Sequence, residues 1–200
     1  MTRRGLAAWL LLGMLAAAAS GAPARAFSDP EDAARPLTPL ELARLRGGGL
    51  VVRTADVPDF PWPEVRVYRA VAATPAQVMA VYTDLETQAT YMPGLVSSRV
   101  VKRAGASAFH VSYEAEVTGP NERYTVVVAV VRTAAGFQAT WQLLTARYAR
   151  RLSGGLHVEP LDEGALVTYS SRVDPGRLGS AFGTPELVSR RVQATVEALA

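Results

Sequence analysis

A strict alternation of apolar and polar residues between positions 109 and 118 constrains the fold of this chain more than any other feature of its sequence. One set of alternate positions is apolar: Phe109, Val111, Tyr113, Ala115 and Val117. The positions between them are polar: His110, Ser112, Glu114, Glu116 and Thr118. A period of two residues places one set on each face of a β-strand. The pattern therefore predicts a strand that turns one face to a core and the other to solvent, as antiparallel sheets do.

Further strands are predicted on both sides of this one. The segments that are rich in β-branched residues and bounded by turn-forming residues are 50–57, 65–72, 96–103, 123–132, 137–143, 154–161 and 165–173. The segment 123–132 is apolar on both faces, which predicts a position inside the sheet. Together these segments predict an antiparallel sheet of about six to eight strands.

The helices are marked by threonine followed by proline, residues preferred at the N-cap and at the first helical position. Thr38-Pro39 predicts a short helix that Gly47 ends. Thr74-Pro75 predicts another directly after the second strand, and a second short helix is expected over 84–91. The two short helices thus fall between the second and third strands.

The last helix, which begins at Thr184-Pro185, is the one predicted helix long enough to cover the sheet. Its apolar face repeats at helical spacing: Val188, Val192, Val196 and Leu199. A sheet that is apolar on one face must be covered by another layer. We therefore expect an α+β domain in which this helix lies across the sheet, with any ligand bound between the two layers.

The first 26 residues have the order of a cleavable signal peptide. Arg3 and Arg4 are followed by a short apolar run, 6–19, and then by Ala24-Arg25-Ala26. We expect cleavage before Phe27 and an exported protein, periplasmic or extracellular. The sequence then divides into the signal peptide (1–26), a leader with a short helix (27–49) and a ligand-binding domain (50–200).

Charge and composition exclude several classes of function. The chain has 21 Lys and Arg against 18 Asp and Glu, but Arg3, Arg4 and Arg25 lie in the predicted signal peptide, which contains no acid. The cleaved chain then carries 18 of each, so it lacks the basic surplus on which nucleic-acid binding depends. With no cysteine and two histidines, we expect neither disulfides, thiol chemistry, a metal site nor a cofactor.

Three stretches of the sequence stand in a particular order. TPAQVMAVYTD (74–84) follows the second strand, YMPGLVSSRVVK (91–102) leads into the third, and SGGLHVEPL (153–161) precedes LVTY (166–169). In this order the chain resembles the START-like (SRPBCC) superfamily, which includes START lipid-transfer domains, coenzyme-Q-binding proteins and polyketide cyclases. The resemblance covers residues 64–200. It implies a helix-grip fold, in which a curved antiparallel sheet wraps around a long C-terminal helix and leaves a hydrophobic cavity beneath it.

The residues on the predicted inner faces are the candidate lining of that cavity: Tyr113, Phe137, Trp141, Tyr169, Val188 and Val192. All of them would serve equally in a plain core, and the cavity itself is what the resemblance implies. Arg69 shares its face with the valines of its strand, and an inward guanidinium would require a carboxylate or a polar ligand group. A strand twist or bulge would instead turn Arg69 outward. If it points inward, we expect Arg69, with Tyr113, to orient a ligand.

We therefore expect the domain to bind an apolar or amphipathic small molecule, such as a lipid or a quinone, without covalent chemistry. No catalytic residue is predicted. A first alternative is an enzyme like the polyketide cyclases and dehydratases, which would require an inward acid or base. An inward Arg69, Glu114 or His110 would favour it. A second alternative is a closed interaction module that binds no ligand.

A basic cluster suggests a further partner. Arg147, Arg150 and Arg151 surround Tyr148 between two predicted strands. Such a cluster either meets phosphate head groups or forms a solvated turn. Transient contact with a membrane is therefore a further expectation for this chain.

Overall fold

The computed structural model describes residues 35–181 and 183–200. The predicted signal peptide (1–26) and the first part of the leader (27–34) lie outside the described residues. Within the part of the chain that is described, no helix combines the length and the apolar character needed to cross a membrane.

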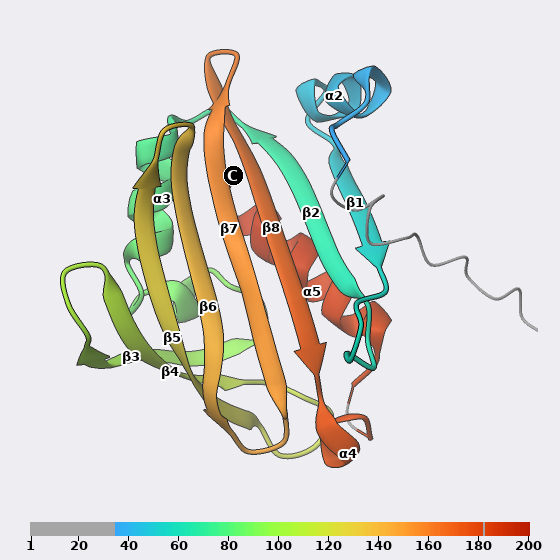
Figure 1. The fold of residues 1–200 in the computed structure, drawn as a ribbon, viewed down its shortest axis with the longest axis vertical. Coiled ribbons are helices and arrows are strands. Elements are labelled where there is room, and N and C mark those ends of the chain that lie inside the picture. The colour runs from blue at the N-terminus through green and yellow to red at the C-terminus, as the bar shows by residue number, and fades with distance from the viewer. Residues whose placement is uncertain (1–34, 182) are drawn as a thin grey trace, which may run out of the picture.

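An eight-stranded antiparallel sheet forms the frame of the domain (Figure 1). The strands lie in the order β1-β2-β8-β7-β6-β5-β4-β3, so β1 and β3 are its edges. Their bounds are Leu50–Ala55 (β1), Glu64–Val71 (β2), Leu95–Arg103 (β3), Ala108–Ala115 (β4), Glu122–Thr133 (β5), Gly136–Ala146 (β6), Arg151–Leu161 (β7) and Gly164–Asp174 (β8). The predicted strands are confirmed, and β5 pairs with a neighbour on each side as its apolar faces suggested.

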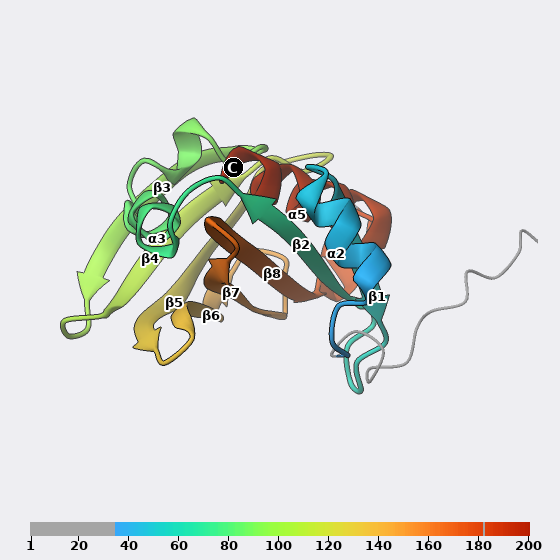
Figure 2. The ribbon, with the colours of Figure 1, turned by 90° about the horizontal axis from the view of Figure 1, so that it is seen from above.

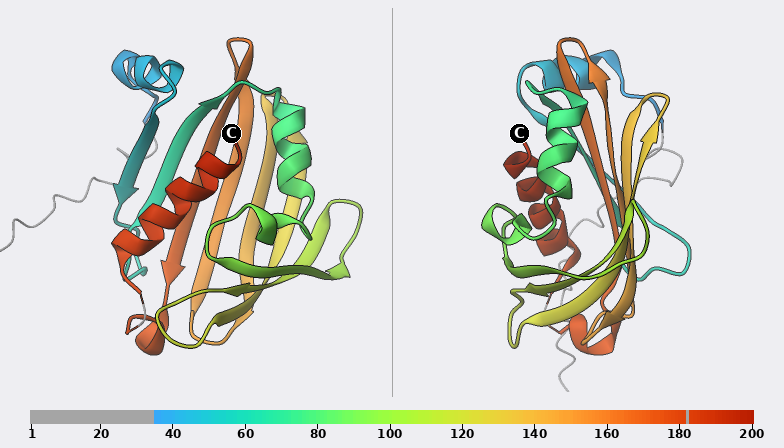
Figure 3. Two further views of the ribbon diagram at one scale, coloured as in Figure 1. Left: turned by 180° about the vertical axis from the view of Figure 1, so that it is seen from behind. Right: turned by 90° about the vertical axis from the view of Figure 1, so that its left-hand side faces the viewer.

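Helix α5 (Pro185–Ala198) crosses the concave face of the sheet, as the view from behind shows (Figure 3). The Thr184 hydroxyl caps it by accepting a hydrogen bond from the backbone N–H of Leu187 at 3.3 Å. The helix contacts β2 and β8. This is the helix-grip arrangement that the resemblance implied.

Helix α3 (Pro75–Thr83) covers another part of the same face and contacts β6, β7 and β8. A reciprocal capping box begins it, in which Thr74 and Gln77 bond each other's backbone N–H groups. The second predicted short helix (84–91) is reduced to a single 3₁₀ turn, η1 (Gln88–Thr90). A short helix that the sequence did not predict, α4 (Gly176–Gly179), follows β8.

The main core lies between the concave face and the two helices. On β4, Val111 and Tyr113 face this core, whereas Glu114 pairs with the exposed Arg123 on the other face. The alternation of this strand therefore has the predicted orientation, with His110 and Glu114 on the outer side. Most inward strand residues thus contribute either to the core or to the space beneath α5.

Helix α2 (Pro39–Arg46) lies at the β1–β2 edge of the sheet (Figure 2). It packs on Val51 and Tyr68, which face away from the main core. Thr38 is its N-cap, as the sequence predicted, and Thr38 and Glu41 form a capping box there. Leu45, Val51 and Tyr68 form a small second core beneath the helix. Residues of the predicted leader therefore pack against the sheet.

Candidate ligand-binding site

Two connected hollows lie between the concave face of the sheet and α5. The larger, which we call the inner chamber, has a volume of about 210 Å³. The other, the outer chamber, measures about 180 Å³ and is bounded by the chain around Trp62, the β6–β7 turn and the segment between β8 and α5. Six residues line both chambers and so form the neck between them: Ala115, Tyr124, Leu152, Val173, Val188 and Arg191.

Aromatic rings form much of the inner wall. Trp141 of β6 lies between Tyr169 of β8 and Tyr82 of α3, with ring centroids 4.8 Å and 6.4 Å away, respectively. Tyr113 and Tyr124, on β4 and β5, are 5.3 Å apart. These are ordinary distances for tilted aromatic pairs, which offer a flat apolar surface with polar edges.

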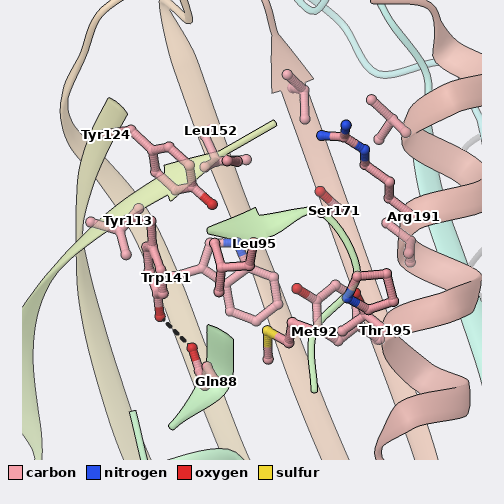
Figure 4. A pocket seen from close by; sticks show the side chains of 18 of the residues that line it. Gln88, Met92, Leu95, Tyr113, Tyr124, Trp141, Leu152, Ser171, Arg191 and Thr195 are labelled. Atoms are coloured by element: carbon pink, nitrogen blue, oxygen red, sulfur yellow. Dashed lines mark hydrogen bonds between the residues drawn. The ribbon is translucent and has the colours of Figure 1, made fainter. Parts of the chain in front are cut away.

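A buried hydrogen-bonded chain closes one side of the inner chamber (Figure 4). The Tyr113 hydroxyl donates to Oε1 of Gln88 at 2.6 Å, and Nε2 of Gln88 donates to the carbonyl of Tyr82 at 2.8 Å. Gln88 is fully buried, so these bonds supply the partners that its amide requires. These hydrogen bonds fix η1 against the sheet and hold the Tyr113 hydroxyl in the wall of the chamber.

The tyrosines of the chamber stay neutral at physiological pH. Burial, and to a smaller extent the nearby Glu122, raise the pKa of Tyr124 to about 12, while Arg191 opposes the shift. Burial is also the main cause of the raised pKa of Tyr113 and of Tyr169. Among the described residues, the hydroxyls of Tyr124 and Tyr169 have no hydrogen-bond partner. Both are therefore neutral groups that a ligand could engage.

Arg191 is the one charged side chain among the described residues that line the inner chamber. It projects from α5 toward the chamber (Figure 4). Its guanidinium lies against the backbone of Gly94, where a Cβ would be 3.4 Å from Cζ of Arg191. A close approach of this kind suits glycine, which here also has a positive φ of 74°. The turn before β3 therefore lies beside this guanidinium at the neck.

Five of the seven residues that the sequence proposed for a ligand cavity line the inner chamber: Tyr113, Trp141, Tyr169, Val188 and Val192. Phe137 lies outside both chambers, at the start of β6, where it packs against the core and carries Arg132 over its ring. The part each plays in binding stays a prediction.

Arg69 lies on the face that carries α5 but outside both chambers. It lines a separate polar hollow beside the α2–β1 turn, together with Arg44, Gln193 and Glu197. Its Nε is buried and, among the described residues, has no hydrogen-bond partner. Arg69 therefore does not share a space with the aromatic wall, and its predicted role in orienting a ligand would have to be exerted from this separate hollow.

Sequence reasoning missed Arg191, Gln88, Ser171 and Thr195, which also line the inner chamber. Part of the signal was present in the last helix. Arg191 and Thr195 lie three and seven residues after Val188, so they share its apolar face. Two polar residues within an apolar helical stripe indicate that the stripe faces something other than a closed core.

The three arginines of the predicted basic cluster lie at or beside the β6–β7 turn. Arg147 lies over the ring of Tyr148, with Cζ 5.0 Å from the ring centroid, and Arg151 lies over Phe60 and pairs with Asp174. Since Tyr148 also lines the outer chamber, the cluster flanks that chamber. Contact with a membrane here stays a prediction.

Comparisons with known proteins agree with this geometry. Residues 63–200 match the sequence model of the family described as polyketide cyclase / dehydrase and lipid transport. No curated protein matches the sequence.

Several solved structures share the fold. A STAR-related lipid transfer protein from Xanthomonas axonopodis superposes with a TM-score of 0.64 at 20% identity, covering 76% of this chain and 91% of that one. The Zhui aromatase/cyclase from a Streptomyces species gives 0.58 at 19% identity, covering 68% and 90%. Human StAR-related lipid transfer protein 5 gives 0.59 at 11% identity, covering 76% and 80%. At these identities the likeness shows a common START-like fold.

Proposed function

The chain belongs to the polyketide cyclase / dehydrase and lipid transport family, and we propose that it binds an apolar or amphipathic small molecule in the two chambers beneath α5. The START-like fold is one whose members include lipid-transfer proteins and an aromatase/cyclase. Binding without covalent chemistry is the simpler use of this site. Affinity would come mainly from apolar burial, at about 25 cal/mol per Å² of surface removed from water.

One observation carries the proposal: space remains between the sheet and α5 where a closed module would place side chains. An engineered apolar cavity of about 150 Å³ is enough to bind benzene. The inner chamber alone measures about 210 Å³ and continues through the neck into the outer chamber. Its wall is aromatic and aliphatic with a few polar groups, which is the usual composition of a small-molecule site.

Of the three residues whose inward position would favour the enzyme alternative, Arg69 lies on the face that carries α5 but outside both chambers. Glu114 and His110 lie on the outer face of β4, where Glu114 bonds Asn121 and Arg123. The polar groups that line the inner chamber are neutral, apart from Arg191. A carrier or sequestering role therefore fits the site better. Export, with cleavage before Phe27, remains part of this proposal.

Filling the neck should weaken binding. Ala115 lines both chambers, so Ala115→Leu places an isobutyl group in the space between them. We expect the affinity for the fluorescent probe N-phenyl-1-naphthylamine, measured by titration, to fall at least tenfold, which is about 1.4 kcal/mol. The matched control is Ala129→Leu on β5, whose neighbours Val126 and Val128 face the core while Ala129 faces outward.

The control variant should bind the probe as tightly as the unaltered protein does. If Ala115→Leu bound the probe as tightly as Ala129→Leu, the probe would bind elsewhere on the protein and not in the chambers. Failure of the unaltered protein to bind the probe would contradict an accessible apolar site. Melting temperatures of the two variants show whether the fold is intact.

A further inference from the structure

The charge distribution of the two chambers is uneven. Every described residue that lines the inner chamber is neutral except Arg191. A guanidinium is permanently charged in proteins and provides five hydrogen-bond donors but no acceptor. A cation beside apolar walls is unfavourable unless an anion or hydrogen-bond acceptors face it. Arg191 is half-buried, so the helix presents to the apolar chamber a cation that an anionic group of a ligand could pair with.

The protein itself does not supply that partner among its described residues, where Arg191 makes neither an ion pair nor a hydrogen bond. The one nearby acid that lines the outer chamber is Glu122. Its carboxylate oxygens accept hydrogen bonds from the backbone N–H groups of Arg147, Tyr148 and Ala149, at 2.9 to 3.2 Å. Glu122 is thus engaged by the β6–β7 turn.

Arg191 also lies where a ligand would pass. Its guanidinium packs on the backbone of Gly94, and the residue lines the neck between the chambers. Tyr124 lines the same neck, and its neutral hydroxyl is a second donor. A guanidinium and a hydroxyl at one end of an aromatic wall match a planar carboxylate attached to an apolar body.

Resting on the function proposed above, we propose that the ligand is a carboxylic acid, with its carboxylate bound by Arg191 at the neck and its apolar body against the wall of Trp141 and Tyr169. Neutral lipids and quinones carry no negative charge that could pair with Arg191. The size of the inner chamber favours one aromatic ring system or one acyl chain over a two-chain lipid.

Two pairs of probes test the inference, each pairing an acid with the alcohol of the same carbon skeleton: 2-naphthoic acid with 2-naphthalenemethanol, and decanoic acid with decanol. Isothermal titration calorimetry at neutral pH gives each affinity. We expect the unaltered protein to bind at least one acid tenfold or more tightly than its alcohol.

Arg191→Gln should reduce the affinity for that acid to the affinity for the alcohol, and the affinity for the alcohol should not change. Arg191→Lys should keep part of the preference, because the charge remains while the planar fork is lost. The control is Arg190→Gln, the exposed neighbour on the same helix, which should retain the full preference. Equal melting temperatures of the Arg190 and Arg191 variants exclude a folding effect.

The outcomes separate this inference from the function on which it rests. Alcohols that bind as tightly as the acids, or a preference for the acid that survives Arg191→Gln, would overturn the inference and leave an apolar binding site standing. Failure of all four probes to bind would overturn both proposals.

Discussion

Replacing Gly154 with alanine should lower the melting temperature of the domain by about 10 °C and impair probe binding in the inner chamber. Gly154 lies on β7 opposite Trp141 of β6. A Cβ at this position would lie 2.3 Å from Cζ2 of the Trp141 indole and 2.3 Å from the carbonyl oxygen of Ser170. Ordinary contacts of this kind begin near 3.4 Å, so one methyl group would displace both neighbours.

The neighbours of Gly154 have little freedom to move. Ser170 belongs to β8, which pairs with β7 along its whole length, so shifting its carbonyl disturbs the sheet. Trp141 is buried and packs against Tyr169, so shifting its indole changes the wall of the inner chamber. Overpacking a well-filled site typically costs about 1–3 kcal/mol. We expect the upper end, about 3 kcal/mol, which corresponds to about 10 °C in a domain of this size.

Gly155 provides the matched control. It is the next residue on β7, but a Cβ there would be no closer than 3.5 Å to any neighbour, which is ordinary contact. Gly155→Ala should therefore melt within a few degrees of the unaltered protein and bind the probe normally. If thermal melts showed both alanine variants to be equally stable, Trp141 would not be seated on Gly154 as described.

Glu41→Ala should make the amides of α2 and β1 exchange with solvent about a hundredfold faster. Arg53 of β1 is 6% exposed, and its Nη2 lies 2.9 Å from Oε2 of Glu41. The same carboxylate pairs with Arg35 and caps α2 through Thr38. Without Glu41, the buried Arg53 guanidinium would keep its hydrogen bonds to the carbonyls of Arg35 and Pro36 but lose its carboxylate. Removing one partner of a largely buried ion pair costs about 3 kcal/mol. If the free energy of local opening falls by that amount, the amides of residues 39–55 exchange about a hundredfold faster.

The Glu41 contribution should depend on pH. Hydrogen bonds from Arg35 and then Arg53 hold the pKa of this carboxyl well below its ordinary value of 4.5. Its stabilising effect is therefore fully present above pH 4.5 and is lost as the pH falls below that value. The difference in exchange between the unaltered protein and Glu41→Ala should shrink on acidification.

Two variants complete this test. Glu41→Gln keeps a capping side chain but removes the charge. Its amide exchange rates in α2 and β1 should therefore lie between those of the unaltered protein and Glu41→Ala. Asp162→Asn removes a carboxylate whose partner Arg46 is exposed, and it should leave exchange of α2 and β1 unchanged. A difference between the unaltered protein and Glu41→Ala that stays constant down to acidic pH would contradict the ionic role of Glu41.

Local patterns in the sequence were sufficient to predict most of the fold. The alternation over 109–118 gave β4 its correct faces, and the threonine–proline pairs marked the starts of α2, α3 and α5. These features depend on neighbours along the chain. Helix α4 was not predicted, because Pro175-Gly176 is typical of a loop and a helix of four residues is too short to show an apolar period.

The candidate site was only partly predictable, because a chamber depends on which strands meet beneath which helix. Arg69 and Phe137 have inward-facing positions on their strands, but α5 and α3 divide the concave face, so these two residues lie outside the chambers. Arg191 was not predicted because the valines of α5 already accounted for the face that packs on the sheet. The chamber becomes visible only when that helix lies on the sheet.

Native mass spectrometry of the full chain, exported to the periplasm of a bacterial host, tests the central claim most directly. The spectrum should contain protein carrying an apolar or amphipathic small molecule that is released on denaturation and identified in an organic extract. A single ligand-free mass, unchanged after incubation with a panel of fatty acids, aromatic acids, phospholipids and quinones, would contradict the claim that the chambers beneath α5 bind such a ligand.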